Sequence, residues 1–305
     1  MGNAALHLFV VLAAAPFLLG VIGRTKAAFA GRSGPSLLQP YHDLVRLFRK
    51  GSVLSRTTTG IFLAGPALAF AAPVAASLLV PFGGSGAPVS FTGDLVLFAY
   101  LFALSRFFTA AAALDTGSAF EGMGAAREVS FACLAEPTLF FGLLAVARIT
   151  GALSLSTMLA HPLSSGWLRS GASIVLVVAA WFVVLLAENS RIPFDDPNTH
   201  LELTMIHEVM VLDHAGPSFG LVLWGAAVKL FVTGAVLVRI VMPFGSQSPW
   251  LSALVFLGGM VLLAVLIGIV ESVMARIRLV GVPQLLVTAC LLSAFGLLLL
   301  VRSAP

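Results

Sequence analysis

Residues 252–275 read SALVFLGGMVLLAVLIGIVESVMA, an apolar run of 24 positions with a single charged residue, Glu271. A helix of that length extends about 36 Å, which is enough to cross the ~30 Å hydrocarbon core of a bilayer. Ionisable groups are costly in that environment. The run therefore predicts a transmembrane helix that carries one carboxylate near its end.

The composition extends this interpretation to the whole chain. Of 305 residues, 59% are hydrophobic and 10% are charged, whereas soluble domains carry about 25% charged residues. This excludes a soluble enzyme, a secreted disulfide scaffold and, despite a pI near 9.6, a nucleic-acid partner. The two cysteines, Cys133 and Cys290, lie in apolar runs. Two isolated cysteines cannot hold an iron–sulfur cluster or a zinc ion.

The hydropathy pattern predicts a single polytopic membrane domain over 1–305, an all-α bundle of about eight transmembrane helices. No internal repeat or second domain is visible. The predicted spans are 4–23, 61–82, 92–114, 129–150, 171–190, 219–242, 252–275 and 283–302.

Loop charges predict the orientation. The loops 24–60, 115–128, 191–218 and 276–282 hold eleven Lys and Arg residues, whereas the opposite side holds Arg169 and Arg302. Because cytoplasmic loops are enriched in Lys and Arg, we expect these four loops in the cytoplasm and both termini outside.

The first long loop contains apolar residues at helical spacing between Leu37 and Phe48, with basic residues on the remaining face. This pattern predicts an amphipathic helix that either lies along the membrane surface or docks a soluble partner. We expect the two long loops to form the docking platform for a peripheral subunit. The docking candidates are Arg24, Lys26, Arg32, Asp43, Arg46, Arg49, Arg127 and Arg191.

Charges inside the predicted spans gather in the cytoplasmic half. At 1.5 Å per residue, Arg106, Glu136, Lys229 and Glu271 lie roughly 12, 10, 15 and 6 Å inside their spans. Asp115 and Glu188 lie at cytoplasmic ends. Structural salt bridges would not favour one leaflet, so the pattern favours a proton path or polar cavity open to the cytoplasm. The outer half has few polar groups, which argues against a complete transporter in this chain alone.

The segment 188–218 is rich in acids and histidines but predicts no metal or catalytic site. His200, His207 and His214 are spaced by seven residues, about 10 Å on a helix, which is too far for one metal ion. His207-Glu208 lacks the second histidine of a zinc-hydrolase motif, because position 211 is Val. We expect the acids Asp195 and Glu202 to transmit a charge change, and the chain to be a non-catalytic coupling subunit.

Several separated motifs resemble one family of membrane subunits nearly end to end. The matching strings are Arg24-Thr-Lys26, Gly31-Arg32-Ser-Gly34-Pro35, Leu38-Gln39-Pro40-Tyr-His-Asp43, Leu114-Asp115-Thr116-Gly117-Ser, Gly124-Ala-Ala-Arg127-Glu128, Ala135-Glu136-Pro137 and Ala187-Glu188-Asn-Ser-Arg191-Ile-Pro193-Phe194-Asp195. Together they resemble the family of membrane subunits that anchor the hydrophilic arm in respiratory complex I, in formate hydrogenlyase (its subunit 4), in group 4 nickel–iron hydrogenases and in hydrogenase-4-type complexes.

The resemblance implies a subunit of the prokaryotic inner membrane that anchors a peripheral redox arm and couples its reaction to proton or Na⁺ translocation. Its partners would be hydrogenase-like large and small subunits, an iron–sulfur protein and antiporter-like membrane subunits. Iron–sulfur clusters and a nickel–iron centre would lie in those partners, with no cofactor in this chain. Glu136 and Glu188 match the family's intramembrane glutamates, and Asp43, Arg46 and Arg127 match its arm-facing loops. Arg106 and Lys229 are added on depth alone.

The acidic loop favours the hydrogenase branch. Quinone-reducing relatives typically have three glutamates at alternate positions after Pro-Phe-Asp, and this chain has Asn198, His200 and Glu202 there. Two alternatives remain open: a quinone-chamber subunit of an NADH:quinone oxidoreductase and a stand-alone ion transporter.

Overall fold

The computed structural model describes residues 2–83, 86–160, 162–195, 206–243 and 248–302. Within those ranges the chain is helical or irregular, with no β-strand. Eight of the helices are long and apolar enough to cross a membrane. The predicted fold class, an all-α membrane bundle of about eight transmembrane helices, is confirmed.

The described helices include short ones between the long apolar ones. They are α1 (Gly2–Phe29), α2 (Gln39–Phe48), α3 (Gly60–Ser77), α4 (Asp94–Asp115), α5 (Ala119–Thr150), α6 (Leu155–Met158), α7 (Pro162–Glu188), the 3₁₀ helix η1 (Glu208–Val211), α8 (Pro217–Val241), α9 (Pro249–Val273) and α10 (Gly281–Arg302).

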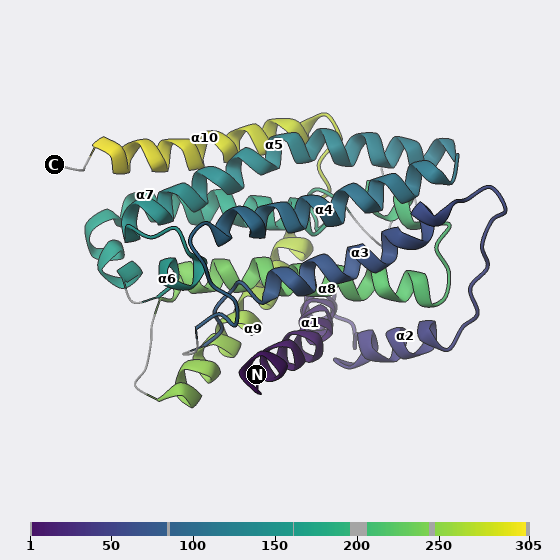
Figure 1. Ribbon diagram of the computed structural model, residues 1–305, viewed down its shortest axis with the longest axis horizontal. Coiled ribbons are helices and arrows are strands. Elements are labelled where there is room, and N and C mark those ends of the chain that lie inside the picture. Colours follow the sequence, from purple (N-terminus) through teal and green to yellow (C-terminus); the bar gives the residue numbers. More distant parts are fainter. Residues whose placement is uncertain (1, 84–85, 161, 196–205, 244–247, 303–305) are drawn as a thin grey trace.

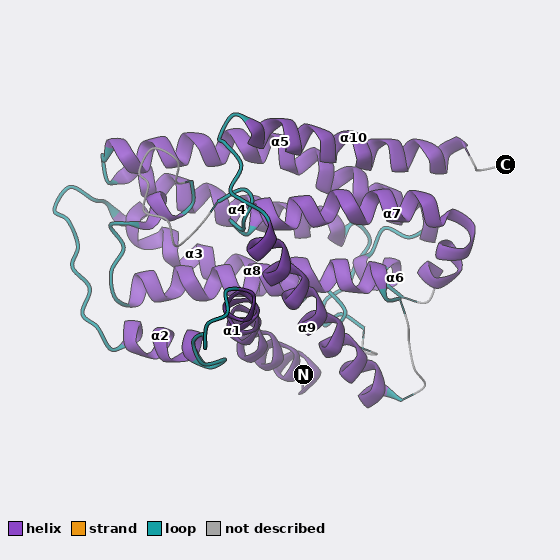
Figure 2. Ribbon diagram, turned by 180° about the vertical axis from the view of Figure 1, so that it is seen from behind, coloured by secondary structure: helices purple, strands orange, loops and turns teal. Residues whose placement is uncertain are grey.

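Helix α8 forms the centre of the bundle, with the side chains of Phe231, Val232 and Ala235 completely buried. Helices α1, α3 and α7 all contact α8. Helix α10 packs along α5 and α7 at one side, while α9 packs on α1 at the other and crosses the bundle obliquely (Figure 1 and Figure 2). The charged positions of α4, α7 and α8 thus face a shared interior.

Glycines allow α3 to approach both α4 and α8 closely. A Cβ at Gly225 of α8 would lie 2.4 Å from the carbonyl oxygen of Ala69 in α3, and one at Gly65 of α3 would lie 2.6 Å from Cβ of Ala112 in α4. Small residues at such crossings let backbones meet in membrane bundles. This packing draws α4 and α8, which carry Arg106 and Lys229, toward the same helix.

Helix α5 begins ten residues earlier than the sequence predicted. The expected loop over 115–128 is only a short turn around Gly117, whose φ of +73° is a left-handed conformation that glycine adopts without strain. From Ala119 onward the chain is helical, because the alanine, methionine, glutamate and arginine residues around Gly122 and Gly124 favour a helix. The loop prediction is wrong there, and Glu128 becomes part of a long helix.

The predicted amphipathic helix of the first loop is α2. Its Leu47 is buried and contacts Gly220 of α8, and Phe48 meets Trp224 edge-on. The Tyr41 hydroxyl donates a hydrogen bond to the carbonyl of Ala13 in α1. One face of α2 is therefore fixed to the bundle, while its basic face stays exposed.

Candidate functional site

Arg106 of α4 is the hub of a buried ion cluster. Its two terminal nitrogens each lie 2.6 Å from a carboxylate oxygen, one on Glu136 of α5 and one on Glu188 at the end of α7. Its Nε lies 3.5 Å from Glu128, also on α5. The Arg106 side chain is only 8% exposed. A planar guanidinium suits this place, because its donors form a rigid fork that can serve several carboxylates.

Lys229 of α8 extends the cluster. Its ammonium lies 2.8 Å from Glu188, so Glu188 bridges Arg106 and Lys229. Acids and bases alternate from Glu136 through Arg106 and Glu188 to Lys229, and they come from four helices. With Glu128 included, three acids face two bases, an excess of one negative charge when all are ionised.

Such a cluster is expensive to build. Removing ions from water costs several kcal/mol per ion, which attraction between them offsets only when the geometry is good. Three carboxylates that share two cations are electrostatically coupled, so a change of charge at one of them acts on the others. The arrangement is therefore suited to taking up and releasing protons inside the membrane.

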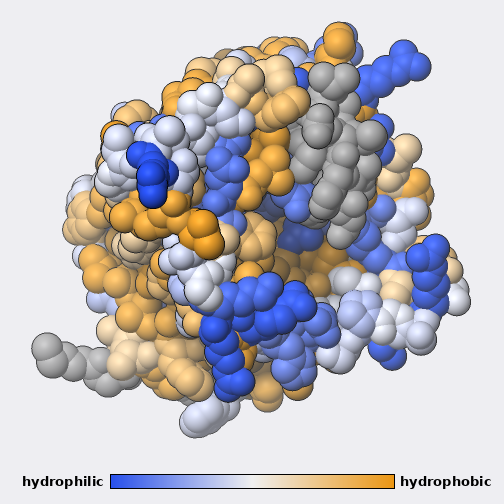
Figure 3. Space-filling view, turned by 90° about the vertical axis from the view of Figure 1, so that its right-hand side faces the viewer, coloured by the Kyte–Doolittle hydropathy of each residue, from blue (hydrophilic) through white to orange (hydrophobic). Residues whose placement is uncertain are grey.

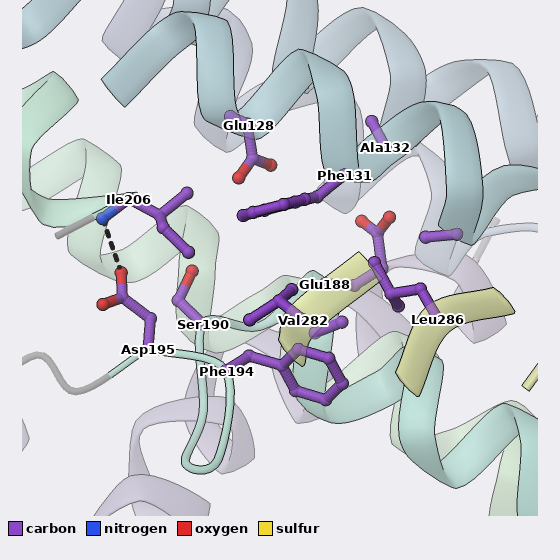
Figure 4. A pocket seen from close by; sticks show the side chains of 12 residues that line it. Glu128, Phe131, Ala132, Glu188, Ser190, Phe194, Asp195, Ile206, Val282 and Leu286 are labelled. Carbon is purple, nitrogen blue, oxygen red and sulfur yellow. Dashed lines mark hydrogen bonds between the residues drawn. The ribbon is translucent and has the colours of Figure 1, made fainter. Parts of the chain in front are cut away.

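Small cavities with charged side chains in their walls adjoin the cluster. One of about 50 Å³ is lined by Arg106, Glu188, Lys229 and His207, and one of about 20 Å³ by Glu128 and Glu188. Figure 4 shows both carboxylates reaching into the smaller cavity, with the Phe131 ring between them in that view. Cavities of this size, with several charged groups in their walls, can hold water, which would let protons exchange between groups that do not touch.

Glu136 differs from the rest of the cluster in its exposure. Its side chain is 45% exposed, against 10% for Glu188. It lines a cavity of about 80 Å³ between α4 and α5, together with Tyr100 and Phe140. The cluster therefore reaches the lateral surface of the bundle at this residue.

A second group of charges lies between α1, α9 and the segment after α7. Glu271, 2% exposed, pairs with Lys26 at 2.8 Å and Arg191 at 3.5 Å. Asp195 pairs with Arg276 at 2.9 Å. Glu271 and Asp195 both line a cavity of about 320 Å³, and the rest of its wall is mostly apolar.

The structure brings together four of the residues predicted for a proton path: Arg106, Glu136, Glu188 and Lys229. It places Glu271 and Asp195 in the second group. Asp115 instead accepts hydrogen bonds from the amide and hydroxyl of Thr59, the N-cap residue of α3, while Glu202 lies outside the described residues. Sequence reasoning missed Glu128, although it stands eight residues before Glu136 and on the same helix face.

The predicted docking residues fall into two sets. Lys26 and Arg191 are held by Glu271, and Arg24 donates to the carbonyl of Ser33. Asp43 pairs with Arg46 at 3.4 Å on the exposed side of α2, and Arg32 and Arg49 are exposed, whereas Arg127 is half-buried. Figure 3 looks onto the end of the bundle where α2 and the loop after it lie, and hydrophilic residues gather there beside hydrophobic ones. Their docking role stays a prediction.

His214 supplies a pH-sensitive point in the segment before α8. It is 6% exposed, its ring stacks on Phe62 at 4.1 Å, and burial lowers its pKa from 6.5 to about 4. A pKa depressed by folding means that the unfolded segment binds the proton first. The neutral, buried His214 ring thus stabilises the folded segment fully above pH 6.5, and this contribution is lost as the pH falls toward 4.

We therefore expect amides of residues 206–216 to lose protection from hydrogen exchange as pH falls through that window, after correction for intrinsic exchange rates. His214→Phe keeps the ring stacking and removes this titration, so its protection should fall less, and the remaining pH dependence should come from His207, whose pKa burial also lowers. Equal pH dependence in both proteins would show that another group controls this segment.

Comparison with known proteins gives consistent matches. The NADH dehydrogenase family model matches residues 2–302. Formate hydrogenlyase subunit 4 of Escherichia coli (strain K12) is 31% identical over 292 residues, 90% of this chain and 91% of the relative. A subunit of the NADH-quinone oxidoreductase of Rubrobacter xylanophilus is 29% identical over 241 residues, 77% of this chain and 72% of the relative. A chain in the structure of the membrane-bound sulfane sulfur reductase, an archaeal respiratory membrane complex, has the same fold, with a TM-score of 0.83, 21% identity, and coverage of 98% of this chain and 99% of that one.

Proposed function

The chain belongs to the NADH dehydrogenase family, and we propose from this membership that it is the membrane subunit of an energy-converting redox complex. It anchors the peripheral arm that carries the iron–sulfur clusters and the catalytic centre, and it couples that arm's reaction to the movement of protons or Na⁺. The observation that carries the proposal is the Arg106 cluster: five ionisable side chains from four transmembrane helices, linked by ion pairs inside the bundle.

The cluster supports coupling because its charges are interdependent. A change of charge at the arm-facing end alters the field at Glu188, which holds both Arg106 and Lys229. If Glu188 gains a proton, it no longer neutralises Arg106 and Lys229. Arg106 then interacts more strongly with Glu136 and Glu128, the other acids that it contacts. A redox event outside the membrane can thus move a proton inside it.

Glu136 supports a lateral relay to further membrane subunits. A carboxylate 45% exposed at this depth would face lipid, where a charge costs several kcal/mol. A neighbouring antiporter-like subunit that presents a polar side chain at this depth would remove that cost. We therefore propose that such a subunit binds to the face formed by α4 and α5.

We assign the arm to the end that carries residues 30–59, in the cytoplasm, with both termini on the outer side of the inner membrane. Lys and Arg are concentrated at this end, and cytoplasmic loops favour them. Arg46 on α2 and Arg49 at its C-cap are both exposed.

Charge reversal tests this docking surface. Arg46→Glu with Arg49→Glu should release the peripheral subunits in mild detergent at moderate salt, because rim charges contribute through electrostatic complementarity. The matched control is Arg169→Glu with Arg302→Glu, which changes the net charge equally at the opposite end. Copurification of the arm measures the outcome, and an arm retained by the α2 variant at high salt would contradict the assignment.

The hydrogenase branch is the one we favour. Formate hydrogenlyase subunit 4 matches over more of the chain than the subunit of the Rubrobacter NADH-quinone oxidoreductase does, and only the third of the three alternating acidic positions, Glu202, carries glutamate. Identification of the copurifying subunits tests this choice. A large subunit with two C-x-x-C pairs would support a nickel–iron partner, and a chain that purifies alone and transports ions would favour a stand-alone transporter instead.

Quinone reduction remains the second candidate because of the 320 Å³ cavity. Its wall includes Leu19, Phe219 and Leu223, while Lys26 and Glu271 supply a polar end, a combination suited to a ring with an isoprenoid tail. A photoreactive quinone analogue distinguishes the candidates. Labelling of α1 or α8 that excess quinone prevents would favour the quinone-chamber subunit.

A further inference from the structure

Two cavities of different size share one wall. The 320 Å³ cavity reaches the Glu271 group, and the 50 Å³ cavity reaches Arg106, Glu188 and Lys229. The residues that line both are Asn189, Ser190, His207, Val222 and Ala226. Of these five, His207 alone has a side chain that can take up or release a proton near neutral pH. It is thus the ionisable point of contact between the two cavities.

The backbone at His207 is held in place by charged partners. Its amide donates to Oδ2 of Asp195 at 3.0 Å, beside the amide of Ile206 at 3.1 Å, and Asp195 is itself held by Arg276. Directly after it, η1 inserts Val209 against Gly124 of α5, where a Cβ would lie 2.2 Å from Cγ1 of Val209. The imidazole is therefore presented to the shared wall by a fixed segment.

Charged groups face His207 from every neighbouring element. Lys229 comes from α8, Arg106 from α4, Glu188 from α7 and Asp195 from its own segment. Glu128 of α5 lines the 50 Å³ cavity, and the 320 Å³ cavity is lined by Lys26, Arg191, Glu208 and Glu271. Burial, followed by Lys229, lowers the pKa of His207 to about 4. The ring is therefore neutral at physiological pH, and a neutral imidazole has one donor and one acceptor nitrogen at the same time.

We propose that His207 passes protons between the cavity at Glu271 and the Arg106 cluster. A proton that arrives on the unprotonated ring nitrogen is matched by release of the proton from the other nitrogen, so the ring ends as the opposite neutral tautomer and resets by rotation. Asn189 cannot replace it, since its amide donates to the carbonyl of Leu185 and to Thr233 and does not titrate. This inference rests on the proposed coupling function and assigns its entry point.

His207→Ala in the intact complex tests the inference. We expect redox-driven proton uptake to slow by about a hundredfold, the lower range for a positioned proton-transfer group, while electron transfer to an artificial acceptor continues. Added imidazole should restore uptake, because the shortened side chain opens onto the 320 Å³ cavity. Thiazole, a ring of similar size that is barely basic, should not.

The matched control is His214→Phe, which removes a titratable histidine of the same segment, keeps the ring stacking on Phe62 and lies at neither cavity. It should leave proton uptake unchanged. Full uptake in His207→Ala, or a loss that imidazole and thiazole restore equally or not at all in an assembled complex, would overturn the assignment. These results differ from failure of the proposed function, in which variants of the Arg106 cluster would also leave proton uptake unaffected.

Discussion

Arg106→Leu should prevent the complex from accumulating in the membrane. The substitution leaves Glu128, Glu136 and Glu188 close together with only Lys229 to compensate them. Removal of one partner from a buried ion pair destabilises a protein by about 3–5 kcal/mol, a large part of a typical total of about 5–15 kcal/mol. The amount of this chain in the membrane fraction, and of partners copurified with it, measures the effect.

Two variants control for this result. Arg106→Lys keeps the charge but lacks the planar fork, so we expect an intermediate amount of complex. Arg148→Leu removes an exposed arginine near the other end of α5 and should leave the amount unchanged. Normal accumulation of Arg106→Leu would mean that the three carboxylates do not need a shared cation, which contradicts the network described.

Glu188→Gln should uncouple the complex without dismantling it. Glutamine preserves the shape of the side chain but cannot take up a proton, and it removes the charge that bridges Arg106 and Lys229. We expect redox-driven acidification of inverted membrane vesicles to fall by about a hundredfold, while reduction of an artificial acceptor stays near the wild-type rate. Fluorescence quenching of a pH-sensitive dye and acceptor absorbance report the two activities.

Glu121→Gln is the matched control for this substitution. Glu121 lies on α5, is 1% exposed and accepts a hydrogen bond from the amide of Asp213, outside the Arg106 cluster. Its replacement makes the same chemical change at a similarly buried carboxylate, so vesicle acidification should persist. Equal losses in both variants would point to general damage rather than to a role of Glu188.

The fold class followed from the sequence because membrane spans are long, apolar and nearly uncharged. Arg106 and Lys229 stood out for the same reason, since a charge within an apolar run is conspicuous. Glu136 and Glu188 were singled out by their positions in the spans and also by the resemblance to a known family. Depth along a helix thus identified candidate residues, and the structure shows that four of them form one cluster of ion pairs.

Depth did not reveal which residues meet. Glu271 lies in the same half of the bundle as Glu188, but α9 packs on α1, and Glu271 pairs with Lys26 of that helix. Lys26 and Arg191 were predicted as docking residues because loop charges are usually solvated, yet both neutralise Glu271. Pairing depends on which helix faces are in contact, and a single sequence does not carry that information.

Glu128 was missed because the predicted fourth span began at residue 129, one residue after it. The sequence placed it in a loop, where an acid needs no explanation, whereas α5 begins at Ala119 and carries Glu128 into the interior beside Arg106. The signal was present in the spacing, since Glu128 and Glu136 fall on one helix face. His207 was judged only as a metal ligand, and its place between two cavities depends on tertiary structure.

The central claim is that this chain couples a redox reaction to ion movement through the Arg106 cluster. Its most direct test is the number of ions moved per electron by the purified complex in sealed liposomes, with an ionophore to confirm the gradient. We predict a constant, uncoupler-sensitive ratio for the wild type and a ratio near zero for Glu188→Gln at unchanged electron flow. An unchanged ratio in that variant would contradict the account.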